Sequence, residues 1–264
     1  MYLKIYKRFS TLNLNLKGEL KPYVSLNENL ETEFYKAKWI DAGQEFTKNF
    51  RKEFECSPNQ LKEYLESVKF AAQNQIAERK EFALLGRSNV GKSSMINSIL
   101  NFKMMDTSNM PGKTRELNFI TMNPQSGAVL IDPPGYGYAK GQRKELQAWG
   151  KMMQNYFVHS SHLHRLFILI DSEHGIKEVD LMLMEMLEQK MKPYVIVYTK
   201  CDKINQQKQL KLIEEAKSKL KDKVLSYHIL HFTSSKNNFG IAHLKAQIAY
   251  LLQLQLLGSI NDAV

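Results

Sequence analysis

From residue 82 onward, short apolar runs alternate with segments in which apolar residues recur every three or four positions. The runs predict strands, and the periodic segments predict helices, because residues share a face every 3.6 positions in a helix. The predicted strands are FALLG (82–86), LNFITM (117–122), AVLID (128–132), LFILID (166–171), PYVIVYTK (193–200) and SYHILHFTS (226–234). The predicted helices are SSMINSIL (93–100), KELQAWGKMMQNYF (144–157), EVDLMLMEMLEQ (178–189), 210–220 and IAHLKAQIAYLLQLQ (241–255).

The order of these segments predicts the fold class. Strands that alternate with helices along the chain pair in parallel, because each helix carries the chain back across the sheet in a right-handed crossover. We therefore expect an α/β protein of three layers, with a mainly parallel central sheet flanked by helices on both faces. In such sheets, ligands bind beyond the carboxyl ends of the strands. The segments that follow the strands are the places to look for chemistry.

Residues 1–66 lack this alternation, and we assign them to an N-terminal extension of a domain that spans 67–264. The extension begins MYLKIYKRFSTLNLNLKG, which contains four basic residues and no acidic one. This composition resembles a mitochondrial transit peptide with few arginines, and the alternative is a basic tail without an address on a cytoplasmic protein. The segment from Ser57 predicts a helix, because Pro58 suits the first helical position and apolar residues then recur at helical spacing.

Composition excludes some classes of protein. The 264 residues suit one buried domain with an appendage, and no apolar run approaches the ~20 residues of a membrane-spanning helix, so we expect no membrane partner. Cys56 and Cys201 lie far apart without metal-ligand spacing, which favours a reducing compartment. The net charge of +10 favours a polyanionic partner such as nucleic acid, but acidic residues are interleaved throughout, so charge alone names no partner.

The segment GRSNVGKS (86–93) matches the pattern G-x-x-x-x-G-K-[ST] between a predicted strand and a predicted helix. Its glycines let backbone N–H groups face a phosphate at the helix N-terminus. Lys92 is expected to reach the outer phosphates, and the hydroxyl of Ser93 to bind Mg²⁺. A glycine-rich turn with an incidental lysine is the alternative, and the flanking strand and helix argue against it. The sequence therefore predicts a site for a nucleoside triphosphate or diphosphate.

The segment TKCD (199–202) follows the predicted strand YVIVY and indicates which base is bound. The carboxylate of Asp202 can accept two hydrogen bonds from the N1–H and N2–H₂ groups of guanine, whereas adenine offers no such pair. Lys200 can lay its apolar stem along the base. A lysine and an aspartate after a strand are common in loops, but their place downstream of the phosphate turn favours guanine.

Two further segments follow predicted strands at the same edge. DPPG (132–135) supplies Asp132, which can hold Mg²⁺ through water, and Gly135, whose N–H can contact the γ-phosphate. TSSK (233–236) places a backbone N–H near Ser235, where it can meet the guanine carbonyl. Each segment alone would also make a good turn or helix cap. Four such segments in this order indicate a GTP or GDP site.

The chain resembles the EngB/YihA family of translation-factor-class GTPases over roughly Glu66 to Leu256, in the segments GRSNVGKSSMIN, MPGKTRELNF, DPPGYGYAK, TKCDK and TSSKNNFGI. The resemblance implies a P-loop GTPase fold and Mg²⁺-dependent hydrolysis of GTP to GDP and phosphate. It implies a partner in the precursor of the large ribosomal subunit, through ribosomal RNA and proteins. Bacterial members lack a long N-terminal extension, so the extension implies an organellar, mitochondrial member. We expect the protein to act as a monomer.

The family pattern also assigns the residues of the site. Those expected at the nucleotide are Gly86, Arg87, Ser88, Asn89, Val90, Gly91, Lys92, Ser93, Ser94, Gly112, Lys113, Thr114, Asp132, Pro133, Pro134, Gly135, Thr199, Lys200, Asp202, Lys203, Thr233, Ser234 and Ser235. Those expected to act in catalysis are Lys92, Thr114 and Gly135. Those expected to hold Mg²⁺ are Ser93, Thr114 and, through water, Asp132.

Three residues depart from the family pattern. Pro133 stands where the family has Leu or Met and removes one backbone donor from the second switch. Met110 replaces a threonine before PGKT, which makes Thr114 the candidate Mg²⁺ ligand of the first switch. Glu173 stands where relatives carry arginine, which removes a positive charge from a candidate RNA-facing surface. None of the three removes the nucleotide pocket.

The residue after Gly135 bears on the rate of hydrolysis. It is Tyr136, where Ras-like enzymes have the glutamine that orients the attacking water, and a tyrosine cannot do this in the same way. We expect unassisted hydrolysis on the order of 10⁻⁴ s⁻¹, as for Ras, and a stimulation of ~10³–10⁵-fold by a charge that the ribosomal particle supplies. Asn89 could help to hold an activating K⁺ ion, or could serve the turn alone.

Three interpretations of function remain open at this point. The first is a switch, in which the γ-phosphate and Mg²⁺ order the loops around Thr114 and Asp132–Tyr138, which then bind a ribosomal precursor. The second is an RNA-binding scaffold that GTP stabilises and that hydrolyses it weakly. The third is a cation-stimulated GTPase that acts on another RNA. The candidates for phosphate-backbone contacts are Lys113, Arg115, Lys140 and Arg143.

Overall fold

The structure is a computed structural model, and it describes residues 19–26, 52–56, 80–103, 105, 117–123, 128–136 and 143–261. These residues include all the strands and helices predicted from residue 82 onward and two further strands. The strands are β1 (Tyr23–Ser25), β2 (Lys52–Cys56), β3 (Lys80–Gly86), β4 (Leu117–Asn123), β5 (Ala128–Asp132), β6 (Leu163–Asp171), β7 (Tyr194–Thr199) and β8 (Ser226–Phe232). The helices are α3 (Lys92–Leu100), α4 (Arg143–His159), α5 (Glu178–Gln189), α6 (Gln206–Leu220) and α7 (Ile241–Asn261), with a short 3-10 helix, η3 (Cys201–Lys203).

All six predicted strands and all five predicted helices are confirmed, with shifts at their ends. β6 begins at Leu163 rather than Leu166, and α7 continues to Asn261. The helix predicted from Ser57 lies outside the described residues. In the part of the chain that the structure describes, no helix has both the length and the apolar character needed to cross a bilayer.

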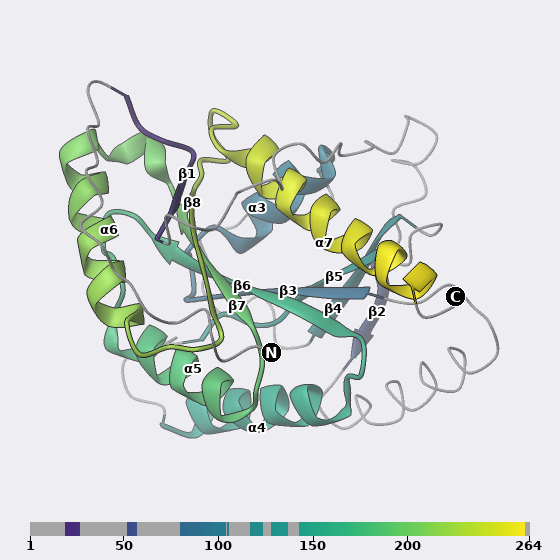
Figure 1. Ribbon diagram of the computed structural model, residues 1–264. Helices are drawn as coiled ribbons and strands as arrows, with labels where there is room; N and C mark the ends of the chain where they lie inside the picture. The colour runs from purple at the N-terminus through teal and green to yellow at the C-terminus, as the bar shows by residue number, and fades with distance from the viewer. Residues whose placement is uncertain are drawn as a thin grey trace.

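The described strands form one sheet in the order β1-β8-β7-β6-β3-β5-β4-β2. The five central strands, β5, β3, β6, β7 and β8, pair in parallel, as Figure 1 shows. β4 pairs antiparallel with β5, because the four residues between them in the chain are too few for the crossover that a parallel pair needs. The mainly parallel sheet of the prediction is therefore confirmed, with antiparallel strands at both sides.

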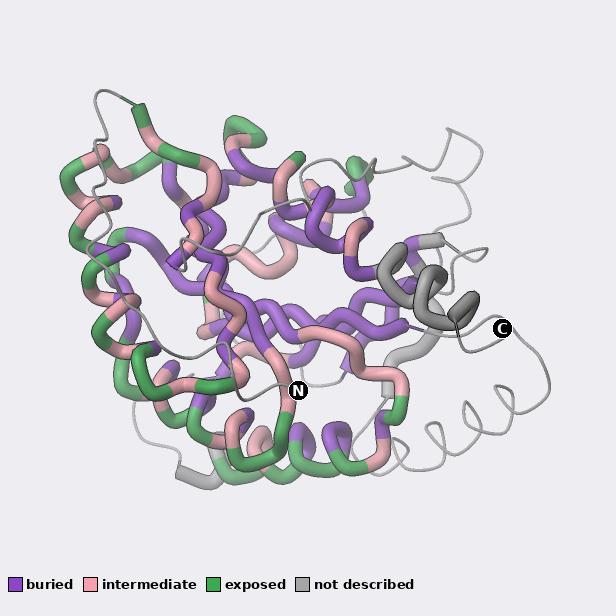
Figure 2. Tube along the Cα trace, viewed as in Figure 1, coloured by how far each residue is buried: buried purple, intermediate pink, exposed green. Residues whose placement is uncertain are grey.

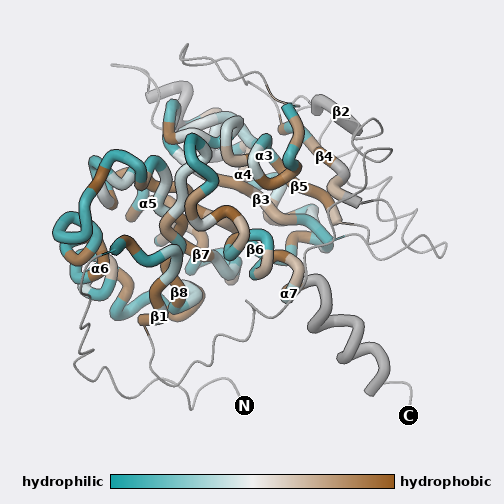
Figure 3. The backbone as a smooth tube through the Cα atoms, turned by 90° about the horizontal axis from the view of Figure 1, so that it is seen from above, coloured by the Kyte–Doolittle hydropathy of each residue, from teal (hydrophilic) through white to brown (hydrophobic). Residues whose placement is uncertain are grey.

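Helices cover both faces of the sheet, which gives the three predicted layers. Apolar residues of α4, α5 and α6 pack in one core with Ala83 and Leu85 of β3, whereas α3 and α7 pack on the other face with Phe82 and Leu84. Because both faces of β3 are covered, its apolar run is continuous rather than alternating. Burial is concentrated along the sheet in Figure 2, and Figure 3 shows hydrophilic residues on the outer turns around α5 and α6.

Two edge strands come from the residues that we assigned to the extension. β1 pairs antiparallel with β8, with Tyr23 opposite His231, and Val24 beside it is buried in the core. Next to β1, the backbone of Lys21 and the side chain of Gln209 exchange hydrogen bonds of 3.0 and 2.7 Å. β2 pairs with β4 at the opposite edge of the sheet. The hydrophobic pattern did not predict either strand, since neither is long enough to show a period.

Candidate functional site

A tight turn joins β3 to α3 at the carboxyl edge of the sheet. Gly91 is the N-cap of α3 and has the left-handed conformation (φ 104°, ψ 23°), which favours glycine. Because glycine has no side chain, it cannot occupy the first N–H groups of the helix, which stay available to an anion. Asn89 is also left-handed (φ 61°), a conformation that asparagine tolerates better than most residues. This accounts for Asn89 as a turn residue, and its predicted K⁺ contact stays a prediction.

The turn is packed closely against the sheet beneath it. A Cβ atom added to Gly86 would lie 2.6 Å from Val90 Cγ1 and 3.1 Å from Leu169 Cβ. Val90 is buried in the core, so only its backbone can face a nucleotide. The hydroxyl of Thr199, at the end of β7, donates to the Val90 carbonyl at 2.8 Å. The backbone of the turn is therefore held in place from below by core contacts and by β7.

The segment after β5 packs directly on this turn. The N–H of Ser88 donates to the Tyr136 carbonyl at 3.3 Å, and the N–H of Tyr136 donates to the Gly86 carbonyl at 3.2 Å. A Cβ atom at Gly135 would lie 2.8 Å from Ser88 N, so this close approach requires glycine. The indole N–H of Trp149 donates to the Pro134 carbonyl at 2.8 Å. Gly135 is thus fixed beside the phosphate turn, as a γ-phosphate contact requires.

Lys92 and Asp132 interact through their charges at the start of α3. Burial lowers the pKa of Lys92, and the negative charge of Asp132 opposes this shift. Asp132 is itself buried, with 1% of its surface exposed, at the last position of β5. A lysine ammonium in partly desolvated surroundings acts on a phosphate with less screening than one in bulk water. The pair places one positive and one negative group at the predicted position of the outer phosphates.

The donor set here fits Mg²⁺. Ser93 is the second residue of α3, and a hydroxyl and the Asp132 carboxylate are the hard oxygen ligands that Mg²⁺ prefers. Among the described residues, no group of three His, Cys, Asp or Glu side chains could hold a metal, so phosphate oxygens and water would supply the remaining ligands. When bound, Mg²⁺ neutralises charge on the phosphates. Gly112, Lys113 and Thr114 lie outside the described residues.

The base site is built from two loops after β7 and β8. The Ser234 hydroxyl donates to Asp202 Oδ1 at 2.6 Å, which fixes the orientation of the carboxylate. Asp202 is exposed in η3, where a base can reach it. Gly240 is left-handed (φ 70°), and a Cβ atom there would lie 2.0 Å from the Phe232 carbonyl oxygen. Glycine at this position lets the TSSK loop fold back beside Asp202.

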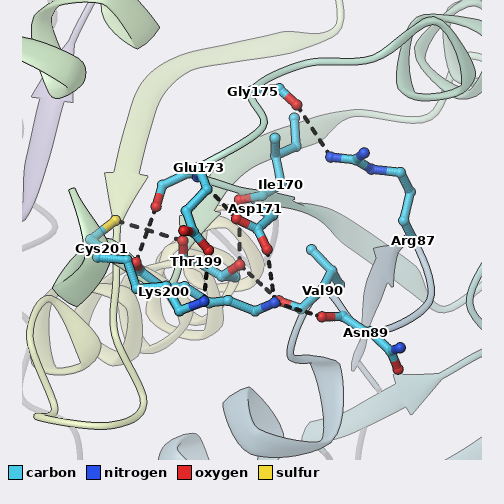
Figure 4. Close-up of polar contacts among 12 residues, drawn as sticks. Arg87, Asn89, Val90, Ile170, Asp171, Glu173, Gly175, Thr199, Lys200 and Cys201 are labelled. Carbon is cyan, nitrogen blue, oxygen red and sulfur yellow. Dashed lines mark hydrogen bonds and ion pairs between the residues drawn. The ribbon is translucent and has the colours of Figure 1, made fainter. Parts of the chain in front are cut away.

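Lys200 links the base site to the phosphate turn (Figure 4). Its ammonium donates to the Asn89 carbonyl at 2.8 Å and lies 2.7 Å from Asp171 Oδ2. The Ser172 hydroxyl also donates to the Lys200 carbonyl, at 3.1 Å. Burial raises the pKa of Asp171, but hydrogen bonds from Lys200 and the Glu173 N–H lower it by more, so the net shift is downward. Asp171 and Ser172 therefore hold the lysine that the sequence singled out.

Several side chains of the predicted set point into the protein. Arg87 donates to the Gly175 carbonyl at 3.2 Å, as Figure 4 shows, and Thr233 donates to the Tyr198 carbonyl at 2.8 Å. Like Thr199, these residues can offer a nucleotide only their backbone. Lys203 pairs with Glu173 at 2.6 Å on the exposed rim of the base site. Glu173, which stands where relatives carry arginine, is therefore the partner of Lys203 at this rim.

Asp171 and Ser172 were not among the residues predicted from the sequence. The sequence did contain a signal for Asp171. It is the last residue of the buried run LFILID in β6, and a carboxylate at the carboxyl end of a parallel strand lies at the edge of the sheet where ligands bind. Asp180, a buried carboxylate on α5 that contacts the turn from another part of the chain, was also not among the predicted residues. No local pattern could have shown that contact.

Comparison with known proteins identifies the family. Residues 81–200 match the family described as "50S ribosome-binding GTPase". A "Probable GTP-binding protein EngB" from Ruegeria sp. is 38% identical over 176 residues, which cover 66% of this chain and 81% of the relative. The chain belongs to the EngB family. A protein of the same name from Allorhizobium ampelinum is 40% identical over 176 residues, covering 64% of this chain and 80% of that one.

Solved structures agree on the fold of this EngB-family chain. The crystal structure of a probable GTP-binding protein engB covers 66% of this chain and 98% of its own, with a TM-score of 0.52 and 22% identity. An Era variant from Aquifex aeolicus, crystallised with GDP.AlF4-, matches with a TM-score of 0.54 and 23% identity over 66% of this chain and 57% of that one. The P-loop GTPase fold is thereby confirmed, and the chain is a GTP-binding EngB-type GTPase.

Proposed function

We propose that this GTPase is a molecular switch in assembly of the large ribosomal subunit, and that it works in mitochondria. The observation that carries the proposal is the direct packing of Gly135 on the phosphate turn. A Cβ atom added to Gly135 would lie only 2.8 Å from Ser88 N, so the two backbones are in contact. A γ-phosphate bound at the turn would therefore lie close to Gly135, where the second switch begins. The family description, "50S ribosome-binding GTPase", supports a large-subunit partner.

The site residues divide the work of binding and hydrolysis. The turn and the N-terminus of α3 bind the phosphates, Lys92 supplies a positive charge, and Asp202 selects guanine. Ser93 and Asp132 would hold Mg²⁺. Lys200 keeps the base site and the phosphate turn in register. Cleavage of the bond to the γ-phosphate by water gives GDP and phosphate, and loss of the γ-phosphate removes its contact with the Gly135 N–H.

The position of Tyr136 supports slow hydrolysis by the protein alone. Its ring is buried, with 2% of its surface exposed, and its hydroxyl is held by Asp180, so it cannot orient a water at the γ-phosphate. A stimulating charge from the ribosomal particle, or K⁺ near Asn89, would then complete the site. The same observation favours the second candidate, a GTP-stabilised RNA-binding scaffold. The third, action on another RNA, has no structural observation that favours it.

Sedimentation tests the switch directly. The purified protein is mixed with large-subunit precursors and with GDP or a non-hydrolysable GTP analogue, and co-migration is measured. We expect binding mainly with the analogue, and a multiple-turnover GTPase rate that the particles raise by at least ~10³-fold. Lys92→Ala, which lacks the charge at the outer phosphates, should lose both effects. Binding that ignores the nucleotide, without stimulated hydrolysis, would identify the scaffold instead, and co-purification with a different RNA would identify the third candidate.

The mitochondrial location rests on the basic, acid-free start of the chain, residues 1–18. Fused to a fluorescent reporter, these residues should direct it to mitochondria. A version in which Lys4, Lys7 and Arg8 are changed to glutamine should stay outside, because import addresses depend on their positive charge. A diffuse signal from the unchanged fusion would identify the segment as a basic tail and place the protein in the cytoplasm.

A further inference from the structure

One buried carboxylate joins three segments that lie far apart in the sequence. The hydroxyl of Tyr136 donates to Asp180 Oδ1 at 2.8 Å, and Arg87 Nε lies 3.4 Å from the same oxygen. The backbone N–H of Lys177 donates to Asp180 Oδ2 at 2.8 Å. The side chain of Asp180 is 0% exposed. Both oxygens of a fully buried carboxylate are therefore engaged, one by the start of α5 and the other by Arg87 and Tyr136.

The two partners of Oδ1 belong to the two halves of the phosphate site. Arg87 lies in the turn after Gly86, and Tyr136 immediately follows Gly135. Their backbones already pair, through the Ser88 N–H and the Tyr136 N–H. Asp180 thus ties these same two segments together a second time, through their side chains. Two independent links leave little freedom for Gly135 to move relative to the turn.

The chemistry of the cluster suits a fixed link. Burial raises the pKa of Tyr136 well above its ordinary value, and the charge of Asp180 raises it further, so the hydroxyl keeps the proton that it donates. The guanidinium of Arg87 places a positive charge beside the same oxygen. Because Oδ1 is buried and accepts its hydrogen bond from Tyr136, loss of that hydroxyl leaves an acceptor that water cannot readily satisfy. The cluster therefore favours one arrangement strongly over looser ones.

We propose that Asp180 is a positioning residue of the GTPase site. It holds Gly135 at the distance from the phosphate turn at which the Gly135 N–H can donate a hydrogen bond to the γ-phosphate. The inference deepens the proposed switch and rests on it, because a switch needs a site that distinguishes GTP from GDP. The α- and β-phosphates lie on the turn and do not need Gly135. Loosening the cluster should therefore weaken the binding of GTP more than the binding of GDP.

The test compares two buried tyrosines that each donate to a carboxylate. Tyr136→Phe removes the donor to Asp180, and Tyr156→Phe removes an equivalent hydrogen bond of 2.6 Å to Glu81 near the start of β3. Dissociation constants for GDP and a non-hydrolysable GTP analogue are measured at fixed Mg²⁺ by calorimetry, without ribosomal particles. In Tyr136→Phe, we expect the ratio of analogue to GDP constants to rise about 5- to 20-fold, within the usual range of coupling between sites. Tyr156→Phe should leave the ratio unchanged although its melting temperature falls similarly.

Asp180→Asn should also raise the ratio of the dissociation constants for the GTP analogue and GDP. If this variant does not fold, the result for Tyr136→Phe tests the proposal. An unchanged ratio in Tyr136→Phe, with a loss of stability like that of Tyr156→Phe, would overturn the inference and leave the cluster a purely structural one. Failure of the parent protein to bind large-subunit precursors would overturn the proposed function and leave this result standing. The two failures are therefore distinguishable.

Discussion

At the scale of single residues, the predicted preference for guanine rests on the carboxylate of Asp202, whose orientation Ser234 fixes. We predict that Asp202→Asn shifts the preference from guanosine to xanthosine nucleotides, because the amide presents a donor to the guanine N–H groups and suits the xanthine carbonyl. GDP should bind roughly 10²-fold more weakly or worse, since an unpaired polar group in a recognition site is costly. Calorimetric titration with GDP and XDP measures this. Asp222→Asn, at an exposed position after α6, is the control, and unchanged GDP affinity of folded Asp202→Asn would remove the guanine assignment.

The ion pair of Asp171 and Lys200 predicts a specific dependence of stability on pH. The pKa of Asp171 is lower in the folded chain than in the unfolded one, so its stabilising contribution is complete above the unfolded pKa, ~3.9, and is lost as the pH falls through the folded value. The gap in melting temperature between the parent and Asp171→Asn should be constant from about pH 7 to about pH 5 and shrink below about pH 4. Thermal unfolding at several pH values checks it. A gap that widened with acid would contradict the direction of the shift.

At the scale of elements, the sequence predicts helices with a clear apolar period and strands with a continuous apolar run. β3 and β7 are buried on both faces, so continuous apolar runs such as FALLG and YVIVY identify them. The order of turn, Asp132, Asp202 and Ser235 then locates the site, because parallel strands bring their ends to one edge. β1 escapes prediction because three residues cannot show a period, and its place depends on the exposed edge of β8. The link from Arg87 to Asp180 escapes for a similar reason, since only the folded sheet brings α5 to the turn.

The edge strand β1 also separates a dispensable segment from a structural one. Deleting residues 1–18 should leave stability and GTP affinity unchanged, whereas deleting 1–26 removes the buried Val24 and Leu26 and bares the edge of β8. Each of these side chains contributes about 1.5–3 kcal/mol when fully buried, and each kcal/mol shifts the melting temperature by about 2–4 °C in a domain of this size. We therefore expect a drop of roughly 6–24 °C for the longer deletion only, measured by calorimetry. Gln209→Ala, which breaks the contact with Lys21, should give a smaller drop, and equal melting temperatures for both deletions would show that β1 contributes nothing.

At the scale of the whole molecule, the charge of +10 favours a polyanionic partner other than the nucleotide, because Lys200 and Lys203 at the base site are already paired with carboxylates. If the switch-flanking residues Lys113, Arg115, Lys140 and Arg143 contact RNA phosphates, each contact releases counterions, and binding weakens as salt rises. We predict that the logarithm of the affinity for large-subunit precursors, with the GTP analogue bound, falls linearly with the logarithm of salt concentration. Each contact contributes ~0.7–0.9 to the slope. Lys140→Ala should therefore reduce the slope by about that amount and weaken binding at low salt, because it removes one such contact.

Lys221→Ala is the matched control for that measurement, since it removes the same charge from an exposed position just after α6. Both variants have the same net charge, so a general effect of charge would change both slopes equally. A specific contact changes only the slope of Lys140→Ala. If binding of the parent protein does not depend on salt, its contacts with the precursor are made with ribosomal protein rather than with RNA phosphates. Equal slopes for the two variants would mean that the RNA-binding surface does not include Lys140 beside the second switch. The nucleotide would then have to control RNA binding from a distance.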